Sequence, residues 1–472
     1  MNDAKIKNDP IYLNLQNADL PVPAGVNIRL LERLAKVVRG FLFAAVEAGQ
    51  SGHPGSSSKV EEILSLVLGL PLAYNPINPK HPGRDRIVWS AGHCTPALFG
   101  TNALIYECLR RVGRQFSEAV VHPIFPEDLV RFRHVDGPQG HAESIHPLSD
   151  YSTGPSGHGL SAAGGMAIVH KSCGLSTKVW VMMGDAESEE GMTYEARNIL
   201  ATTGTNNIVV TLDYNHFGID GPIEDVISSP YINHWLGLGW NVIEVDGHNF
   251  VELITAYRTA EKGFENKKPT VILAHTLKGK SYGNRENTAL SHGSPIPHDE
   301  YVAVMNNLGF AIPGKKDEAG ADIETVLMTL TAEEEKYVAE KLEEGSEKIL
   351  AEQKLVEIMK DALTDRSFVN PINIHRPKTL PPELIFAPGS KIATRKAAGI
   401  FFAWLMKQSA FVYTGAGDVG GSIGTSPTEK IYGLYNSQNP TGRGIRFGIA
   451  EQNMAMMSVG LTNDILPGGY QP

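Results

Sequence analysis

Two polar residues, Asp185 and Asn215, each follow a run of apolar residues, and their types suit a hard metal ion. Residues 179–183 (VWVMM) lead into Gly184 and Asp185, and residues 208–212 (IVVTL) lead to Asn215. Such runs are typical of buried parallel strands, which end at one edge of a sheet where ligands bind. A carboxylate and an amide oxygen at that edge would suit Mg²⁺, which leaves positions free for ligand phosphates. Taken alone, the two residues are explained at least as well as a helix cap and a turn asparagine.

Five histidines form a second group, because each stands beside a glycine or in a glycine-containing turn. They are His53 in SGHPG, His93 in SAGHC, His141 in QGHAE, His158 in PSGHG and His292 in SHGSP. A zinc site commonly takes two histidines one helical turn apart, and this spacing is absent among the five. A single loop histidine is usually solvated, whereas five at glycine turns favour a shared pocket in which imidazoles exchange protons.

A third feature is Glu451 in the segment GIAEQ, at the head of an apolar stretch. A glutamate at this place is explained by its favourable interaction with the positive end of a helix dipole. From the residue alone we therefore assign Glu451 no chemical role.

The elements that must position these residues alternate in type along the first 310 residues. Helical spacing occurs in 28–48, 61–68 and 190–202, and β-branched runs occur near 179, 208, 241 and 270. This alternation predicts an α/β fold: a doubly wound parallel sheet with helices on both faces. The first predicted domain covers residues 1–310.

The character of the chain changes after residue 310. Residues 331–363 are rich in Glu and Lys with an apolar stripe, which predicts a pair of amphipathic helices bent near Gly345. Residues 375–391 are rich in proline. We therefore predict a linker over 311–391. A second α/β pattern covers 392–472, which is shorter than a complete domain of its kind.

Composition excludes some classes of function. The 472 residues are 42% hydrophobic and 20% charged, and the formal net charge is −10, which argues against nucleic acid or an anionic membrane as the main partner. The three cysteines are too scattered for a disulfide framework or a zinc ribbon. The first residues lack the apolar core of a signal peptide, and no apolar run approaches the ~20 residues of a membrane helix. We expect a cytoplasmic protein.

The segment GDAESEEGMTYEARNIL, followed by NNIVVTLDYNHFGIDG, resembles the thiamine diphosphate signature of the transketolase family. The resemblance implies a thiamine diphosphate-binding fold. It also implies that Asp185, Asn215 and the backbone carbonyl of Phe217 coordinate the Mg²⁺ that accompanies the cofactor. Ala186 stands where the family pattern has a glycine.

The histidine and glycine motifs are similar to further motifs of that family. The resemblance implies that His53, His141 and His292 line the substrate channel and act in proton transfer, and that His93 lies beside the cofactor. It implies further cofactor contacts from Gly154, Pro155, Ser156, Gly184, Glu190 and Asn215. Glu190 and Glu195 resemble glutamates at the family's dimer interface, so we expect a homodimer or another two-fold assembly.

In the last part of the chain, Glu451 matches the glutamate that hydrogen-bonds the aminopyrimidine ring of the cofactor and promotes formation of its ylide. The segment TGAGDVGGS resembles a family segment that places Asp418 near the cofactor and Ser422 near a substrate phosphate. Arg395 in ATRKA matches an arginine that contacts the same phosphate, although a surface ion pair explains Arg395 equally well. Transketolases usually read GIREH at this place. GIAEQ is more similar to the corresponding segment of split transketolases and deoxyxylulose-phosphate synthases.

The activity implied is transfer of a two-carbon ketol unit from a ketose, such as a sugar phosphate, to an aldose through the thiamine diphosphate ylide, as in pentose phosphate metabolism. The chain ends before the aromatic motif that completes the family's pyrimidine-binding domain. We therefore expect 392–472 to be an incomplete domain, inactive without a C-terminal partner subunit. The alternatives are a thiamine-dependent synthase, a 2-oxoacid dehydrogenase component, or a non-catalytic remnant serving as a scaffold.

Overall fold

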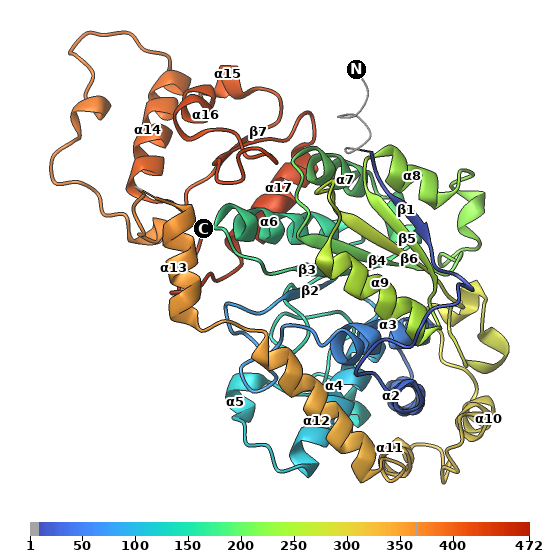
Figure 1. The fold of residues 1–472 in the computed structure, drawn as a ribbon. Helices are drawn as coiled ribbons and strands as arrows, with labels where there is room; N and C mark the ends of the chain where they lie inside the picture. Colours follow the sequence, from blue (N-terminus) through green and yellow to red (C-terminus); the bar gives the residue numbers. More distant parts are fainter. Residues whose placement is uncertain (1–8, 365) are drawn as a thin grey trace.

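A six-stranded parallel sheet forms the centre of the computed structural model, which describes residues 9–364 and 366–472 (Figure 1). Its strand order is β1-β5-β6-β4-β3-β2, and every neighbouring pair is parallel. The strands are β1 (Tyr12–Asn14), β2 (Arg86–Trp89), β3 (Val179–Gly184), β4 (Ile208–Tyr214), β5 (Asn241–Asp246) and β6 (Thr270–His275). The parallel sheet and the strands predicted near 179, 208, 241 and 270 are confirmed.

Strands β3 and β4 are neighbours, and they end together. Gly184 pairs with Asp213 at the end of their register. Asp185 and Asn215, which follow these strands, therefore leave the sheet at the same edge, as predicted from the apolar runs.

Helices cover both faces of the sheet because alternate strand residues point to opposite sides. On β3, Trp180 and Met182 belong to one apolar core, and Val181 and Met183 belong to the other. The first core contains residues of α2 (Ile28–Gly49), α3 (Val60–Leu64), α4 (Thr95–Arg111) and α9 (Phe250–Lys262). The second contains residues of α6 (His158–Ser172), α7 (Gly191–Thr202) and α8 (Tyr231–Gly237). The sheet is thus doubly wound.

The predicted pair of charged helices is present as α12 (Ala332–Glu347) and α13 (Glu352–Ala362). The break between the two helices falls at 348–351 and not at Gly345, which lies inside α12. Val338 and Leu342 of α12 are buried in the first core, together with residues of α10 (His298–Leu308) and α11 (Ala319–Leu327). The first core therefore extends past residue 310, where we predicted that the first domain would end.

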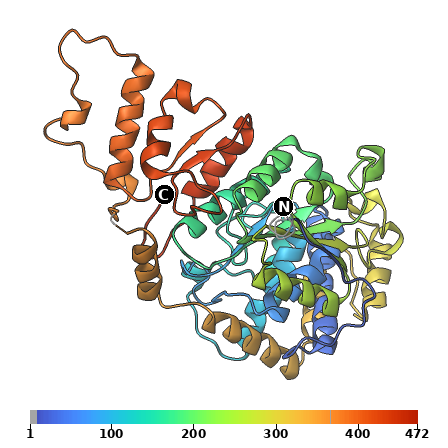
Figure 2. The same cartoon turned by 45° about the horizontal axis from the view of Figure 1, so that its top comes forward.

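A smaller unit follows α13. It contains α14 (Thr394–Gln408), α15 (Gly420–Ile423), α16 (Ser426–Tyr432), α17 (Glu451–Thr462) and a two-stranded parallel sheet of β7 (Thr414–Ala416) and β8 (Gly444–Arg446). The segment before α14 loops outward from this unit (Figure 2). None of the helices in the described ranges has the length and apolarity needed to cross a membrane.

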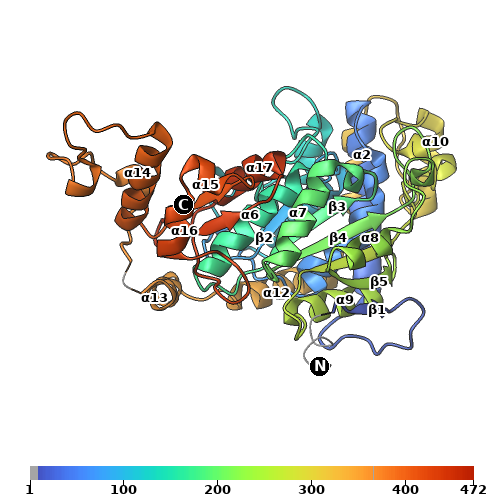
Figure 3. The same ribbon diagram turned by 90° about the horizontal axis from the view of Figure 1, so that it is seen from above.

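Helix α17 lies along α6 of the main sheet unit (Figures 1 and 3). Two glycines allow the backbones to touch. A Cβ atom on Gly165 would lie 2.1 Å from the carbonyl oxygen of Met457, and one on Gly460 would lie 2.0 Å from that of Ala162. Neither position can hold a side chain without separating the helices.

A buried ion pair joins the same two parts of the chain just beyond α17. Asp464 accepts hydrogen bonds from Arg86 Nε at 2.9 Å and from His170 Nε2 at 2.7 Å. Burial opposes ionisation of Asp464, but Arg86 and His170 hold the pKa of its carboxyl well below the usual range. The smaller unit is therefore attached to the main sheet by polar contacts as well as by apolar packing.

Candidate active site

A cavity of about 840 Å³ follows the carboxyl ends of β3 and β4. It brings together most of the residues that the sequence suggested. These are His53, His93, His141, Gly154, Ser156, Gly184, Asp185, Glu190, Asn215, Phe217 and His292. Residues separated by up to about half of the chain thus converge on one edge of the sheet, where α/β proteins bind ligands.

The Asp185 carboxylate is fixed by the loop that carries Asn215. Its Oδ2 accepts the backbone amide of His216 at 2.7 Å, and its Oδ1 accepts that of Ala186 at 2.8 Å. Asn215 Oδ1 accepts the amide of Phe217 at 3.1 Å. A carboxylate, an amide oxygen and the Phe217 carbonyl therefore lie in one loop system, and this donor set fits Mg²⁺.

Burial strongly affects Asp185. It raises the pKa of the Asp185 carboxyl to about 7, and the neighbouring Asp213 carboxylate adds to the effect. A divalent cation would oppose this shift by favouring the charged form. Within the described ranges, no group of three or more His, Cys, Asp or Glu side chains is arranged to hold a metal. The set around Asp185 is of a different kind, with one carboxylate, one amide and one peptide carbonyl.

Lys278 places a cation in the same cavity. Its ammonium donates a hydrogen bond to the Phe217 carbonyl, and the residue is only 6% exposed. Burial lowers the pKa of Lys278, and the Asp185 and Asp213 carboxylates partly offset that effect. Sequence reasoning missed this residue, although it lies three positions after the end of β6 and the search for polar residues at strand ends would have found it.

Glu187 holds three of the loops around the cavity together. Its carboxylate accepts the amide of Gly184 at 2.8 Å, the amide of Gly157 at 3.3 Å and the hydroxyl of Ser90 at 3.0 Å. Burial raises its pKa to about 6, while the three donors favour the charged form. Sequence reasoning missed this role also, because it depends on tertiary contacts that the motif GDAESEEG does not reveal.

Gly157, at the start of α6, requires glycine for two reasons. Its φ of +80° is disfavoured for other residues, and a Cβ atom there would lie 2.9 Å from Glu190 Cβ. The chain can therefore pass close to the cavity between residues 154 and 157.

Four of the five histidines form one cluster. The ring centroid of His53 lies 5.1 Å from that of His93, 6.0 Å from that of His141 and 5.3 Å from that of His292. The fifth, His158, begins α6 and does not line the cavity, so the prediction of a pocket shared by all five is wrong for this residue.

The clustered imidazoles are neutral near pH 7. Burial lowers the pKa of His53 to about 4 and that of His292 to about 3, with nearby positive groups adding to the effect. Burial likewise brings the pKa of His93 well below its ordinary value. The Nδ1 atoms of His53 and His292 are buried without a hydrogen-bond partner among the described residues. Buried polar atoms of this kind are suited to a polar ligand.

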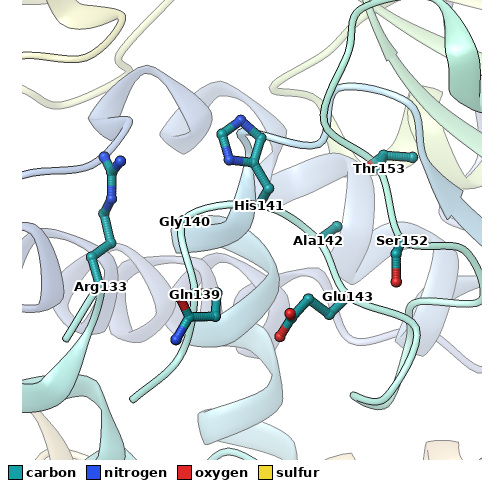
Figure 4. Close-up of a pocket in the computed structure, with 8 residues that line it drawn as sticks. All are labelled: Arg133, Gln139, Gly140, His141, Ala142, Glu143, Ser152 and Thr153. Atoms are coloured by element: carbon teal, nitrogen blue, oxygen red, sulfur yellow. The ribbon is translucent and has the colours of Figure 1, made fainter. Parts of the chain in front are cut away.

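A second, more polar cavity of about 500 Å³ adjoins the first through their shared residue His141. Figure 4 shows the Arg133 guanidinium and the His141 ring on one side of the loop 139–143, and the side chains of Gln139 and Glu143 on the other. Arg133 contributes to lowering the pKa of both His53 and His141, after burial. It is a further residue that sequence reasoning missed.

The remaining predicted site residues do not line either cavity. Pro155 is exposed between Gly154 and Ser156, and Arg395, Asp418, Ser422 and Glu451 are exposed on the smaller unit. Glu451 is the first residue of α17, near which Glu195 Oε2 accepts the amide of Asn453 at 3.0 Å. This chain therefore brings the predicted metal, diphosphate and histidine residues together but leaves Glu451 outside the cavity.

Comparison with known proteins agrees with this architecture. Residues 31–365 match the family described as "Transketolase, thiamine diphosphate binding domain". A curated relative, transketolase-like protein 2 of Bos taurus, is 33% identical over 61% of this chain and 44% of its own length. The 6-deoxy-6-sulfo-D-fructose transketolase subunit SqwG of Clostridium sp. (strain MSTE9) is 29% identical over 59% of this chain and 96% of its own length. The chain thus spans less than half of the bovine relative.

The fold itself matches a solved structure, transketolase from Leishmania mexicana. The TM-score is 0.73 at 22% sequence identity, and the match covers 92% of this chain and 62% of the other. At this identity the similarity demonstrates a shared α/β fold, which includes the parallel sheet and its flanking helices.

Proposed function

The chain belongs to the transketolase family, and from this membership we propose that it transfers a two-carbon ketol unit from a ketose to an aldose. The observation that carries the proposal is the contact between Asp185 and the amide of His216. It supports an oxygen set suited to Mg²⁺ in the same cavity as the histidine cluster. Thiamine diphosphate, when bound, would supply the carbon nucleophile that this reaction requires.

We propose that Asp185, Asn215 and the Phe217 carbonyl hold Mg²⁺ and that Lys278 faces the diphosphate. The fit rests on the oxygen chemistry of this set and on the buried ammonium of Lys278 beside it. The segment 154–157 and Gly184, whose amides Glu187 helps to hold, would approach the diphosphate closely. Glu190 and His93 line the same cavity and complete the proposed cofactor site.

His53, His141 and His292 are the proposed substrate residues. Because their imidazoles are neutral near pH 7, each can donate a hydrogen bond to a sugar hydroxyl or accept a proton from one. The unpartnered Nδ1 atoms of His53 and His292 support this role, since a ligand hydroxyl would satisfy them.

The second cavity provides a place for an anionic end of the sugar. Arg133 lines that cavity beside His141, and a guanidinium is well suited to a phosphate or a sulfonate. We propose a sugar phosphate as the substrate class; the sulfo-sugar in the name of the clostridial relative makes a sulfonate the second candidate. Arg395 and Ser422 stay as proposed anion ligands from the smaller unit.

We propose that Glu451 and Asp418 serve the cavity of a second copy in a two-fold assembly. Glu451 is exposed and lies outside its own cavity, and Ile449 nearby is 81% exposed. The smaller unit also has an apolar groove of about 310 Å³, lined by residues that include Phe411, Phe447 and Leu461. A separate C-terminal subunit is the proposed partner, and the clostridial relative is itself named a subunit.

The test begins with cofactor binding and then measures ketol transfer in an assay with purified components. The chain, alone and co-expressed with its neighbouring reading frame, is titrated with thiamine diphosphate in the presence and absence of Mg²⁺. Ketose phosphates and an aldose acceptor are then supplied, with pyruvate in parallel. Ketol transfer supports the proposal. Release of carbon dioxide from pyruvate would favour a thiamine-dependent synthase or dehydrogenase component, and failure to bind the cofactor would leave a non-catalytic scaffold.

A further inference from the structure

His248 lies outside the cavity, yet it is bonded to the segment that carries Lys278. Its Nε2 atom accepts the backbone amide of Leu277 at 2.9 Å. On the other side of the ring, Nδ1 lies 3.3 Å from Glu61 Oε2. His248 thus stands between a buried carboxylate and the peptide that immediately precedes Lys278.

These two contacts define the tautomer of His248. Because Nε2 accepts a hydrogen bond from the Leu277 amide, the ring proton must reside on Nδ1, which then donates a hydrogen bond to Glu61. Glu61 is itself fixed by Arg39, whose Nη1 donates to Glu61 Oε1 at 2.7 Å. Glu61 and Arg39 are 6% and 4% exposed. The imidazole therefore has a rigid, charged support on the side away from the cavity.

The same support reaches the loop that carries His53. Arg39 Nη2 donates to the carbonyl of Ser57 at 2.9 Å, and the Ser57 hydroxyl donates to the carbonyl of Lys280 at 2.9 Å. The segment 276–280 is thus held at Leu277 by His248 and at Lys280 by Ser57. Between these two points, the Lys278 side chain reaches the Phe217 carbonyl.

We propose that His248 is a positioning residue for the diphosphate half of the site. As the neutral Nδ1–H tautomer, it fixes the Leu277 amide and so holds the Lys278 side chain in the cavity, where its ammonium can face the diphosphate when Mg²⁺ takes the Phe217 carbonyl. This inference rests on the proposed function, because Lys278 is the group assigned to the cofactor diphosphate. His248 itself does not line the cavity and touches neither proposed ligand.

Two substitutions separate the two nitrogens of the ring. The amide oxygen of His248→Gln reaches the place of Nε2 and can accept the Leu277 amide. In His248→Asn, the shorter amide reaches only the place of Nδ1, which keeps the contact with Glu61 and loses the one with Leu277. With Mg²⁺ present, we expect the Asn variant to bind thiamine diphosphate about 10- to 100-fold more weakly, and the Gln variant to bind close to wild type.

A double-mutant cycle with Lys278→Met tests whether His248 acts through Lys278. We expect the Asn substitution to add little to the loss of affinity already caused by Lys278→Met, since the two affect one contact. Additive losses, or equal affinity of the Asn variant and wild type, would overturn the proposal. Thermal unfolding without cofactor identifies any variant that fails to fold, in which case His248→Met, which lacks both ring nitrogens, replaces the Asn variant.

A measurement without cofactor separates this inference from the proposed function. Acetylation of Lys278, followed by mass spectrometry, reports how well its amine is held in the cavity. We expect slow labelling in wild type and in His248→Gln, and faster labelling in His248→Asn; equal rates in all three would contradict the positioning role. A wild-type chain that bound no thiamine diphosphate would overturn the proposed function alone.

Discussion

The Asp185 carboxylate accepts the amide of His216 at 2.7 Å, and this hydrogen bond joins the ends of β3 and β4. His216 has a φ of +66°, a left-handed conformation uncommon for residues other than glycine. The turn at His216 separates the Asn215 side chain from the Phe217 carbonyl by one residue. One contact therefore organises all three oxygens proposed for the metal.

Replacement of Asp185 by Asn should separate metal binding from folding. An amide oxygen can still accept one backbone N–H, but it removes the charge that attracts Mg²⁺. We expect the metal-free variant to unfold close to the wild-type temperature, because the loss of one of the two accepted N–H groups is offset by removal of a buried carboxylate whose raised pKa opposes folding near neutral pH. Addition of Mg²⁺ and thiamine diphosphate should stabilise wild type and not the variant. Equal stabilisation of both proteins would contradict the metal assignment.

The histidine cluster predicts acid sensitivity of the cofactor-free protein. The pKa of His53 is about 4 in the folded chain and ordinarily 6.5, so between these values the unfolded chain binds the additional proton. The contribution of neutral His53 to the free energy of unfolding is fully present above pH 6.5 and is lost as the pH falls toward 4. Denaturant unfolding at pH 7.5 and pH 5 should show that His53→Gln reduces the loss by about 1–2 kcal/mol. His375→Gln, at an exposed position, should leave it unchanged.

Glu187→Gln should weaken the structure around the cofactor loops. The carboxylate accepts three hydrogen bonds, and an amide, which has one acceptor oxygen, turns a donor toward some of the same N–H and O–H groups. We expect a loss of about 1–3 kcal/mol in the free energy of unfolding together with weaker cofactor binding. Glu190→Gln is the matched control for stability, because Glu190 is exposed. A wild-type unfolding curve for Glu187→Gln would refute the role of this carboxylate in joining the loops.

The contact between α6 and α17 should not tolerate a methyl group. Gly165→Ala would place Cβ 2.1 Å from the Met457 carbonyl oxygen, so the helices must separate. We expect a destabilisation of about 1–3 kcal/mol and faster proteolysis between α13 and α14. Gly237→Ala is the control, since no atom beyond the backbone of its own helix lies within 4 Å of the added Cβ. If the two variants were equally stable, the close approach of the helices would be in doubt.

The sequence predicted the parallel sheet and the position of Asp185 because both depend on local patterns, an apolar run and the polar residue after it. The same reasoning did not identify Lys278, since a single lysine in a glycine-containing loop is common. Glu187 and Arg133 were missed because their roles arise from contacts between distant loops. The position of Glu451 outside its own cavity depends on how α17 packs against α6, which no periodicity of either segment specifies.

The crossing of α6 and α17 has a consequence for communication between active sites. Helix α6 begins at the end of the 154–157 loop, and α17 begins at Glu451. Because the two helices touch backbone to backbone, we expect them to move together. In the proposed two-fold assembly, a shift of that loop when one cavity fills would displace the glutamate that serves the other cavity. The two sites would then bind cofactor cooperatively, with the sign set by the direction of that displacement.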